Sequence, residues 1–503
     1  MSSICIYGDS PAAVAAAIQA SRDGYSVVIV TPELHVGGML VEGLGSSDIG
    51  NHDFDNSIAI GGIAREFYQR IGDAYGYTEF GFYKFEPHVA ERVINAWLEE
   101  ASVTVLTNWE LKSVSKIDGR IVRLVSVSEQ TVCADVYIDA SVEGDLMAMA
   151  GVSYTWGREG NEVYGETLNG IRAESPYRNF TIPVDPYIQP GNPSSGTIPT
   201  ISDEPLGMAG EGDRRIMGFC FRMCLTDNPD NQLPFTAPPD YDPRNYEIYR
   251  RYFAAGGADA FFSPRRNQLP NQKTDLGSWH DLSANLYGMN HAWPDATWAE
   301  RRRIYAEHLQ FTQGLFYFLT KDTAVPDSLR KKWLAWGYAA DEFVDNAGWP
   351  RRLYVRSARR MVSDYVINEN HLSTRSGGPI AEDPIGVAFW PPDSHHVRRI
   401  VRNGLAYNEG FVFPQKGQWQ PFGISYRAIV PRRYECTNLL VPACPSSSYV
   451  GYGSLRIEWT FMVMGQSAAS AAVIACKHKI PVQDVPYTLL KKSLNKSRQI
   501  LTV

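Results

Sequence analysis

Residues 4–30 carry the pattern that most restricts the fold of this chain. A short apolar run at 4–7 is followed by a turn at 8–11, an alanine-rich stretch at 12–21 and a second apolar run at 27–30. Short apolar runs bounded by turns are typical of buried strands, and alanine favours helix. A strand, turn, helix and strand in close succession predict an α/β fold with a doubly wound, Rossmann-like sheet.

The turn resembles a dinucleotide-binding sequence with two substitutions. Gly8, Ser10 and Ala13 stand where the glycines of G-x-G-x-x-G would stand. Small residues there let backbone N–H groups and the helix N-terminus approach a pyrophosphate, so we expect a dinucleotide here. An ordinary strand–helix turn is the alternative. Thr31 replaces the acid that usually binds the ribose, and Glu33 is close enough in sequence to reach back.

The rest of the chain falls into three parts. Helix and strand patterns continue to about residue 153, including a helix at 86–101 and a strand at 135–140. Residues 154–420 are rich in proline, glycine and tryptophan and are interpreted as an inserted domain, with helices near 298–319 and 356–368. A strand at 438–442 and a small-residue helix at 457–475 then restore the first pattern.

Composition narrows the classes of partner. Lys and Arg number 48 and Asp and Glu 55, a net charge of −7 that disfavours nucleic acid. No apolar run approaches the roughly 20 residues of a membrane helix, and no signal peptide precedes the first strand. Seven scattered cysteines suggest reduced thiols and a cytoplasmic protein. No metal-ligand spacing is visible in the sequence, so we expect no metal site. We expect the partner to be a small-molecule substrate.

Further motifs point to one family. They include His35-Val36-Gly37-Gly38-Met39, Phe85-Glu86-Pro87-His88, Asp139-Ala140-Ser141-x-Glu143-Gly144-Asp145, Asp393-Ser394-His395, Ser425-Tyr426-Arg427 and Gly465-Gln466-Ser467-Ala468. With these motifs the chain resembles FAD-dependent oxidoreductases of the glutathione-reductase-like fold, some of them labelled xanthan lyase. The resemblance implies an FAD-binding domain at 1–153 and 421–480, an inserted substrate or cap domain at 154–420, and a tail at 481–503.

The resemblance also implies cofactor-binding residues, spread over the whole chain. Gly8 and Ser10 would hold the pyrophosphate, and His35 would pack on the flavin or, alternatively, attach it covalently. The full predicted set is Gly8, Ser10, Pro11, Ala12, Ala13, Thr31, His35, Gly37, Gly38, Met39, Val105, Ala140, Asp145, Arg456, Gln466 and Ser467.

The catalytic prediction rests on polar residues close to the return to the FAD domain. His395 would remove a substrate proton, while Tyr426 or Arg427 would orient the substrate. The arginines at 351–360 form either a solvated helix face or an anchor for an anionic or polyhydroxylated substrate. We predict an FAD-dependent dehydrogenase or oxidase. A flavin-containing lyase, isomerase or cyclase and a cofactor-free scaffold are the alternatives.

Overall fold

The centre of the molecule is a five-stranded parallel sheet. In a computed structural model, residues 3–50, 54–278, 280–375 and 378–503 are described. The sheet has the order β18-β7-β1-β2-β3, and every printed pair of neighbouring strands is parallel. Its strands are β1 (Ser3–Tyr7), β2 (Ser26–Val30), β3 (Thr104–Leu106), β7 (Val136–Asp139) and β18 (Leu439–Leu440). This sheet confirms the predicted α/β class.

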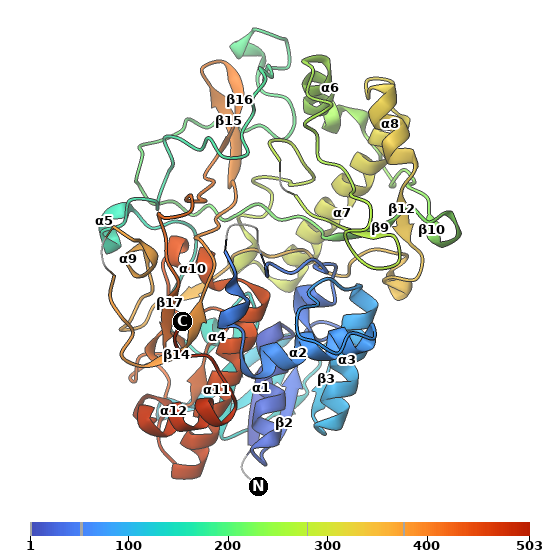
Figure 1. Cartoon of the computed structure of the whole chain (residues 1–503). Helices are drawn as coiled ribbons and strands as arrows, with labels where there is room; N and C mark the ends of the chain where they lie inside the picture. Colours follow the sequence, from blue (N-terminus) through green and yellow to red (C-terminus); the bar gives the residue numbers. More distant parts are fainter. Residues whose placement is uncertain (1–2, 51–53, 279, 376–377) are drawn as a thin grey trace.

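Two helices that lie far apart in the sequence pack together over this sheet (Figure 1). They are α1 (Pro11–Arg22), directly after β1, and α11 (Glu458–His478). Their backbones approach closely at Gly465, where a Cβ atom would lie 2.2 Å from the carbonyl oxygen of Ala12. A larger residue would therefore separate the two helices.

Smaller elements flank the sheet. A three-stranded antiparallel sheet contains β4 (Leu111–Ile117), β5 (Arg120–Ser126) and β6 (Thr131–Val132). The helices of this part are α2 (Gly62–Ala74), α3 (Pro87–Glu100), α4 (Asp145–Met149), α10 (Tyr449–Leu455) and α12 (Tyr487–Lys496). Among the described residues, α11 is the helix long and apolar enough to cross a membrane, but 89% of its most apolar window is buried inside the structure.

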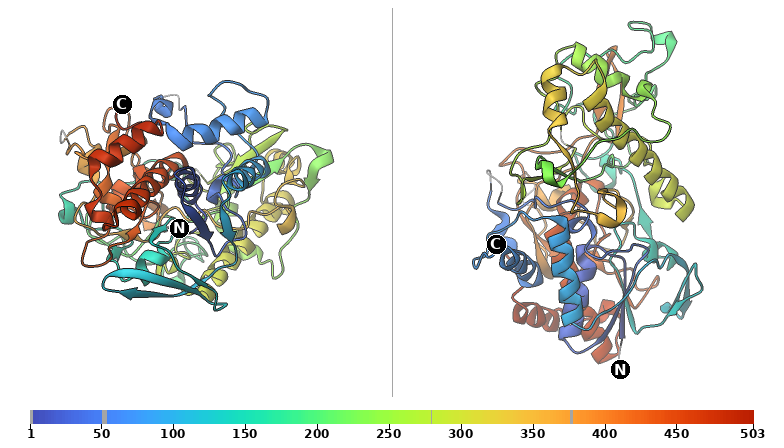
Figure 2. Two further views of the ribbon diagram at one scale, coloured as in Figure 1. Left: turned by 90° about the horizontal axis from the view of Figure 1, so that it is seen from below. Right: turned by 90° about the vertical axis from the view of Figure 1, so that its right-hand side faces the viewer.

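A second hydrophobic core lies above the parallel sheet in Figure 1. Its antiparallel sheet has the order β10-β12-β9-β11, from β9 (Met223–Thr226), β10 (Gln232–Leu233), β11 (Lys273–Leu276) and β12 (Gly337–Ala339). Helices α6 (Glu247–Ala254), α7 (Trp298–Lys321) and α8 (Asp327–Leu334) contribute side chains to the same core. The right-hand view in Figure 2 shows these green-to-yellow segments at the end of the molecule away from the N-terminus. Aromatic side chains such as Phe316, Trp333 and Trp349 fill this core.

Short strand pairs and helices complete the chain. The antiparallel pairs are β8 (Tyr154–Thr155) with β13 (Arg360–Met361), β14 (Pro384–Ala388) with β17 (Phe422–Ser425), and β15 (Arg398–Arg402) with β16 (Leu405–Glu409). The remaining helices are α5 (Asn161–Tyr164) and α9 (Glu369–Leu372). The helix predicted at 298–319 is confirmed by α7, whereas the one predicted at 356–368 is wrong, because that segment is extended and enters β13.

Candidate cofactor and substrate site

A cavity of about 250 Å³ lies beyond the carboxyl ends of the central strands. Its lining includes Gly8 after β1, Glu33 after β2 and Ser141 after β7. The carboxyl edge of a parallel sheet is where proteins of this architecture bind their ligands. Four arginines, Arg301, Arg302, Arg351 and Arg352, bring positive charge to the same cavity.

The turn at Gly8 is built for close backbone approach. Gly8 has φ +110°, and a Cβ atom there would lie 2.4 Å from the backbone nitrogen of Ser141. The Ser10 hydroxyl donates to the Ala140 carbonyl at 2.6 Å, so it ties the turn to the end of β7. Pro11 is the first residue of α1, and Ala12 and Ala13 are buried beside it.

Glu33, and not Thr31, is the residue after β2 that reaches this cavity. Thr31 is fully buried, and its Oγ1 accepts the backbone N–H of Glu33 at 3.2 Å. Burial raises the pKa of Glu33 to about 7. The predicted ribose contact from Thr31 is corrected by this placement. The Thr31 hydroxyl is bonded within the loop after β2, and the Glu33 carboxyl lines the cavity instead.

Asp145 lies in the same cavity but is occupied by protein partners. Arg301 donates to it at 2.6 and 2.8 Å, and Arg359 donates at 2.7 Å. Burial alone would raise the pKa of Asp145, but these two guanidinium groups outweigh it and lower the pKa. Asp145 therefore remains ionised and fixes Arg301, which lines the cavity, and Arg359 behind it.

A second, narrow cavity of about 20 Å³ continues from the first. One side is formed by the fingerprint residues Ser10, Pro11, Gly38 and Met39. The opposite side is formed by Arg352, Leu353, Tyr354, Val355 and Arg356 together with Tyr452, Arg456, Glu458 and Phe461. The structure thus brings the predicted residues Gly38, Met39 and Arg456 into one place.

Glycines again allow the close approach at this second cavity. The N–H of Gly37 donates to the Asp9 carbonyl at 2.7 Å. Gly38 has φ +54°, and a Cβ atom there would lie 3.1 Å from the Cα of Ser10. The loop at 37–39 and the turn before α1 therefore form one wall.

His395 is connected to the second cavity through Asp393 and Arg456. Its Nε2 is 3.6 Å from Asp393, whose backbone carbonyl accepts from Arg456 Nε at 3.0 Å. Arg456 also donates to the Tyr354 hydroxyl at 3.1 Å. Burial lowers the pKa of His395 well below its usual value, and Arg356 and Arg456 lower it further. The imidazole is consequently neutral at neutral pH, and the same surroundings make it a weaker base than a free histidine.

Tyr426 and Arg427 lie elsewhere. The Tyr426 hydroxyl donates to the Val482 carbonyl at 2.7 Å, inside the main hydrophobic core. Arg427 is half-exposed and pairs with Asp383 at 3.2 Å. The prediction that they act beside His395 is corrected, because their polar groups are bound to the tail and to a surface carboxylate.

Gln466 and Ser467 also face away from the two cavities. Gln466 Oε1 accepts the N–H of Ile63 at 2.8 Å, and Ser467 donates to the Ile385 carbonyl at 2.8 Å. Both lie well inside α11, whereas Glu458, in the first turn of that helix, is the residue that lines the second cavity. Neither residue therefore lines the two cavities described above: Gln466 lies at a third cavity beside Gln19 and Gly62, and Ser467 is bonded to backbone carbonyls.

His35 and Val105 lie outside the lining of both cavities. The His35 Nδ1 atom is bonded to Glu91, and its Nε2 lies 3.0 Å from Asp345. Because both ring nitrogens hold carboxylates, the geometry does not support covalent attachment through His35. Val105 is half-buried in β3 and pairs with Ile29.

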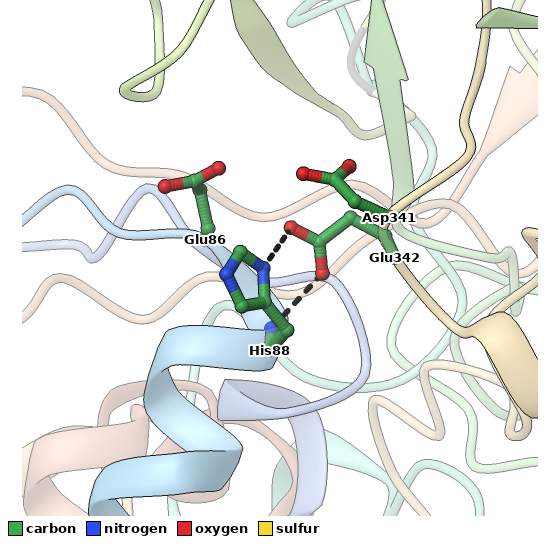
Figure 3. A group of neighbouring side chains, drawn as sticks. All are labelled: Glu86, His88, Asp341 and Glu342. Carbon is green, nitrogen blue, oxygen red and sulfur yellow. Dashed lines mark hydrogen bonds and ion pairs between the residues drawn. The ribbon is translucent and has the colours of Figure 1, made fainter. Parts of the chain in front are cut away.

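A separate cluster of acidic groups joins the two cores (Figure 3). Glu86, His88, Asp341 and Glu342 have ligand-type atoms within 4.8 Å of one another, and His88 Nδ1 lies 2.7 Å from Glu342. The ammonium of Lys273 already lies among them, 2.6 Å from Glu86 and 2.7 Å from each of Asp341 and Glu342. A protein cation therefore already occupies the centre of this cluster.

The fold and the cavities define an α/β protein with a ligand site at the carboxyl edge of a parallel sheet. The family profile described as FAD dependent oxidoreductase matches residues 3–494, and the chain belongs to this family. The match confirms the predicted family, the FAD cofactor and the enzymatic character, and it overturns the cofactor-free scaffold.

Solved structures give a weaker comparison. THI4 of Thermovibrio ammonificans is 21% identical, with a TM-score of 0.23, over 31% of this chain and 66% of that one. L-proline dehydrogenase from P. horikoshii is 13% identical, with a TM-score of 0.25, over 32% and 58%. The flavin-dependent brominase Bmp2 is 19% identical, with a TM-score of 0.24, over 31% and 42%. Such low scores carry no argument about activity. No curated protein matches this chain.

The residues present fit FAD at its nucleotide end. Gly8 lets the turn lie directly against the backbone of Ser141, as a tight nucleotide-binding turn requires, and Glu33 offers a carboxylate for ribose hydroxyls. The four cavity arginines offer N–H donors for a diphosphate, although each is also paired with a carboxylate. Toward the second cavity the space is narrow, so a bound ring system requires the side chains at 352–356 to move.

Sequence reasoning missed several residues of this site. Distant segments that contribute Glu458, Asp393 and Tyr354 meet around the second cavity. Their place at the site is recognised only in the folded chain. Asp393 stood in a motif that was already recognised, two positions before His395, and this spacing was the available signal. Nothing local in the sequence distinguished Glu458 from an ordinary first-turn acid of a helix.

Proposed function

We propose that this protein is a dehydrogenase or oxidase that removes hydride from a C–H bond of a small organic substrate. In this proposal residues 1–153 and 421–480 form an FAD-binding domain of the glutathione-reductase type, and residues 154–420 form the inserted substrate domain. The second hydrophobic core, built from residues between 184 and 406, supports an inserted unit, whereas Ile367, Leu372 and Trp390 of the same span pack in the first core. When bound, FAD supplies the hydride acceptor.

His395 is the proposed base. Oxidation of an alcohol or amine carbon needs a group that takes the proton from oxygen or nitrogen as hydride leaves carbon. The His395 imidazole, neutral at neutral pH chiefly because of its burial, has the unprotonated nitrogen that this step requires. Asp393, 3.6 Å away, is placed to orient the ring. The link from His395 through Asp393 to Arg456, which lines the second cavity, is the observation that carries the proposal.

The test is anaerobic reduction of the bound flavin by a panel of alcohols, amines and sugars, followed as loss of flavin absorbance. His395→Gln should retain the flavin spectrum and slow substrate-driven reduction by about 10²–10⁴-fold. His478→Gln, at the exposed end of α11, is the matched control and should reduce at the wild-type rate.

The same assay separates the remaining alternative. A substrate that is converted without net flavin reduction would establish a lyase, isomerase or cyclase instead. Reduction of His395→Gln at the wild-type rate would leave the FAD-dependent activity standing and remove His395 from it. Cytoplasmic location remains a prediction, supported by seven cysteines that are all free thiols.

A further inference from the structure

Five arginines lie between residues 351 and 360, and four of them have carboxylate partners. Arg351 pairs with Glu42 and Asp345, Arg352 with Asp9 and Glu143, Arg359 with Asp145 and Asp295, and Arg360 with Glu159. Arg356 alone has no carboxylate partner within the described ranges, although its side chain lines the second cavity.

Arg356 is also deeply buried, with 1% of its surface exposed. Its Nη1 donates to the Gly218 carbonyl and, at 3.2 Å, to Asn285 Oδ1. Its Nη2 contacts only the Cys220 sulfur, at 3.0 Å, and its Nε has no hydrogen-bond partner. A buried charge without a counter-ion is costly and needs an explanation.

Strong acceptors occupy the donors of Arg356 on only one side of its guanidinium group. Nη1 is fixed by two good oxygen acceptors, while the edge formed by Nε and Nη2 has only a weak sulfur acceptor. Two parallel N–H groups on one guanidinium edge match the two oxygens of a carboxylate. The vacant edge is therefore shaped for a planar, doubly accepting anion.

We propose that Arg356 binds a carboxylate group of the substrate and so sets its orientation toward His395. The inference rests on the proposed function, since it places the substrate between the second cavity and that histidine. Gly218, whose carbonyl accepts from Arg356, donates its N–H to the carbonyl of His396 at 3.0 Å, so an anion on Arg356 lies near the proposed base. The substrate class is thus an organic acid, such as a hydroxy acid or an amino acid.

The cofactor diphosphate is the competing anion, and the placement of Arg352 argues against it. Arg352 borders the Gly8 turn and holds Asp9 there. Arg356 lies four residues further along an extended segment, and its fixed partners Gly218 and Asn285 come from the region of the second core. Arg352 lines both cavities, whereas Arg356 lines only the second, so Arg352 is the arginine nearer the nucleotide end.

Ligand binding without turnover tests the proposal. The FAD-loaded protein would be titrated with acetate, pyruvate and benzoate, and with the amide of each, while the flavin absorbance spectrum is recorded. We expect at least one carboxylate to bind wild type about tenfold or more tightly than its amide. Arg356→Gln should weaken carboxylate binding on the order of 10–100-fold and leave amide binding unchanged.

Three further variants make the result specific. Arg356→Lys keeps the charge without the two-pronged edge and should retain only part of the preference. Arg402→Gln, on the exposed end of β15, should behave as wild type. Cys220→Ser should keep the preference. Its loss in that variant would identify the thiol sulfur as the partner of Arg356 and overturn the proposal.

Other outcomes also overturn it. Equal carboxylate affinity in wild type and Arg356→Gln, no preference for any acid over its amide, or loss of FAD from a folded Arg356→Gln protein would each do so. If Arg356→Gln fails to fold, Arg356→Lys decides by the same comparison. Failure of every substrate to reduce the flavin, with the carboxylate preference intact, would instead remove the dehydrogenase function and leave this anion site standing.

Discussion

Thr31 and Glu33 stand two residues apart beyond β2, and the backbone N–H of Glu33 donates to the Thr31 hydroxyl oxygen at 3.2 Å. This bond turns the threonine inward and leaves the glutamate at the first cavity. The acid expected by the nucleotide-binding pattern is thus present, displaced by two positions.

Glu33→Gln should weaken FAD binding on the order of 10–100-fold, because the amide accepts hydrogen bonds from ribose hydroxyls without a full charge. Isothermal titration of the flavin-stripped protein with FAD measures the effect. Glu99→Gln, on the exposed side of α3, is the control. An unchanged dissociation constant for Glu33→Gln would remove this carboxylate from the cofactor site.

Gly465→Ala should lower the free energy of unfolding by about 3 kcal/mol, since its new methyl group meets the Ala12 carbonyl 2.2 Å away. Gly72→Ala in α2 is the matched substitution, because its Cβ atom would find its nearest neighbour at 3.5 Å. That variant should be equal to wild type or up to about 1 kcal/mol more stable. Urea unfolding of both variants gives the comparison, and equal losses would contradict the close helix contact.

Glu458→Gln should make stability less dependent on pH. Burial raises the pKa of Glu458 to about 8, with Asp48 adding to the effect, whereas the unfolded value is 4.5. The unfolded chain therefore releases this proton first, and the folded state loses stability as pH rises from about 4.5 to 8. The loss is at most on the order of 5 kcal/mol.

Thermal unfolding of FAD-loaded protein at pH 5 and pH 8.5 checks this. The Glu458→Gln variant should match wild type near pH 5 and have the higher Tm at pH 8.5. Glu382→Gln, an exposed acid, should follow the wild-type curve. If the Tm of Glu458→Gln changed with pH in parallel with the Tm of wild type, the Glu458 carboxyl would have its ordinary pKa in the folded protein.

Lys273→Met should cost about 3–5 kcal/mol of stability, because Glu86 and Glu342 would keep their buried charges without the ammonium. Denaturant unfolding measures the loss. Lys331→Met, on the exposed face of α8, should change stability by less than about 0.5 kcal/mol. A loss of that small size at Lys273 would mean that His88 and water suffice for the two acids.

The parallel sheet could be predicted from the sequence because its strands are apolar on both faces. The apolar runs at 4–7, 27–30 and 135–140 indicate buried strands without any tertiary information. The helix predicted at 356–368 was wrong, because it was inferred from arginines that have the i,i+4 spacing of a helix face. In the structure that spacing serves an extended chain whose guanidinium groups meet acids from several different segments.

The site was predictable only where backbone geometry dictates the residue. Gly8, Gly37 and Gly38 adopt conformations that disfavour larger residues, so their positions show in the sequence. Tyr426, Arg427, Gln466 and Ser467 were chosen by their nearness in sequence to the returning segment, which does not determine where a side chain points. Their hydrogen bonds to Val482, Asp383, Ile63 and Ile385 are properties of the folded chain alone.

Strand β18 pairs with β7 across about 300 intervening residues, and α11 follows it before packing on α1. During synthesis, therefore, the strands near the N-terminus emerge from the ribosome long before the neighbours that complete their hydrophobic layer. The nascent chain must keep β7 and the outer face of α1 uncovered until residues 439–478 have been translated. Such a delay makes the growing polypeptide a natural client for chaperones that shield exposed strands.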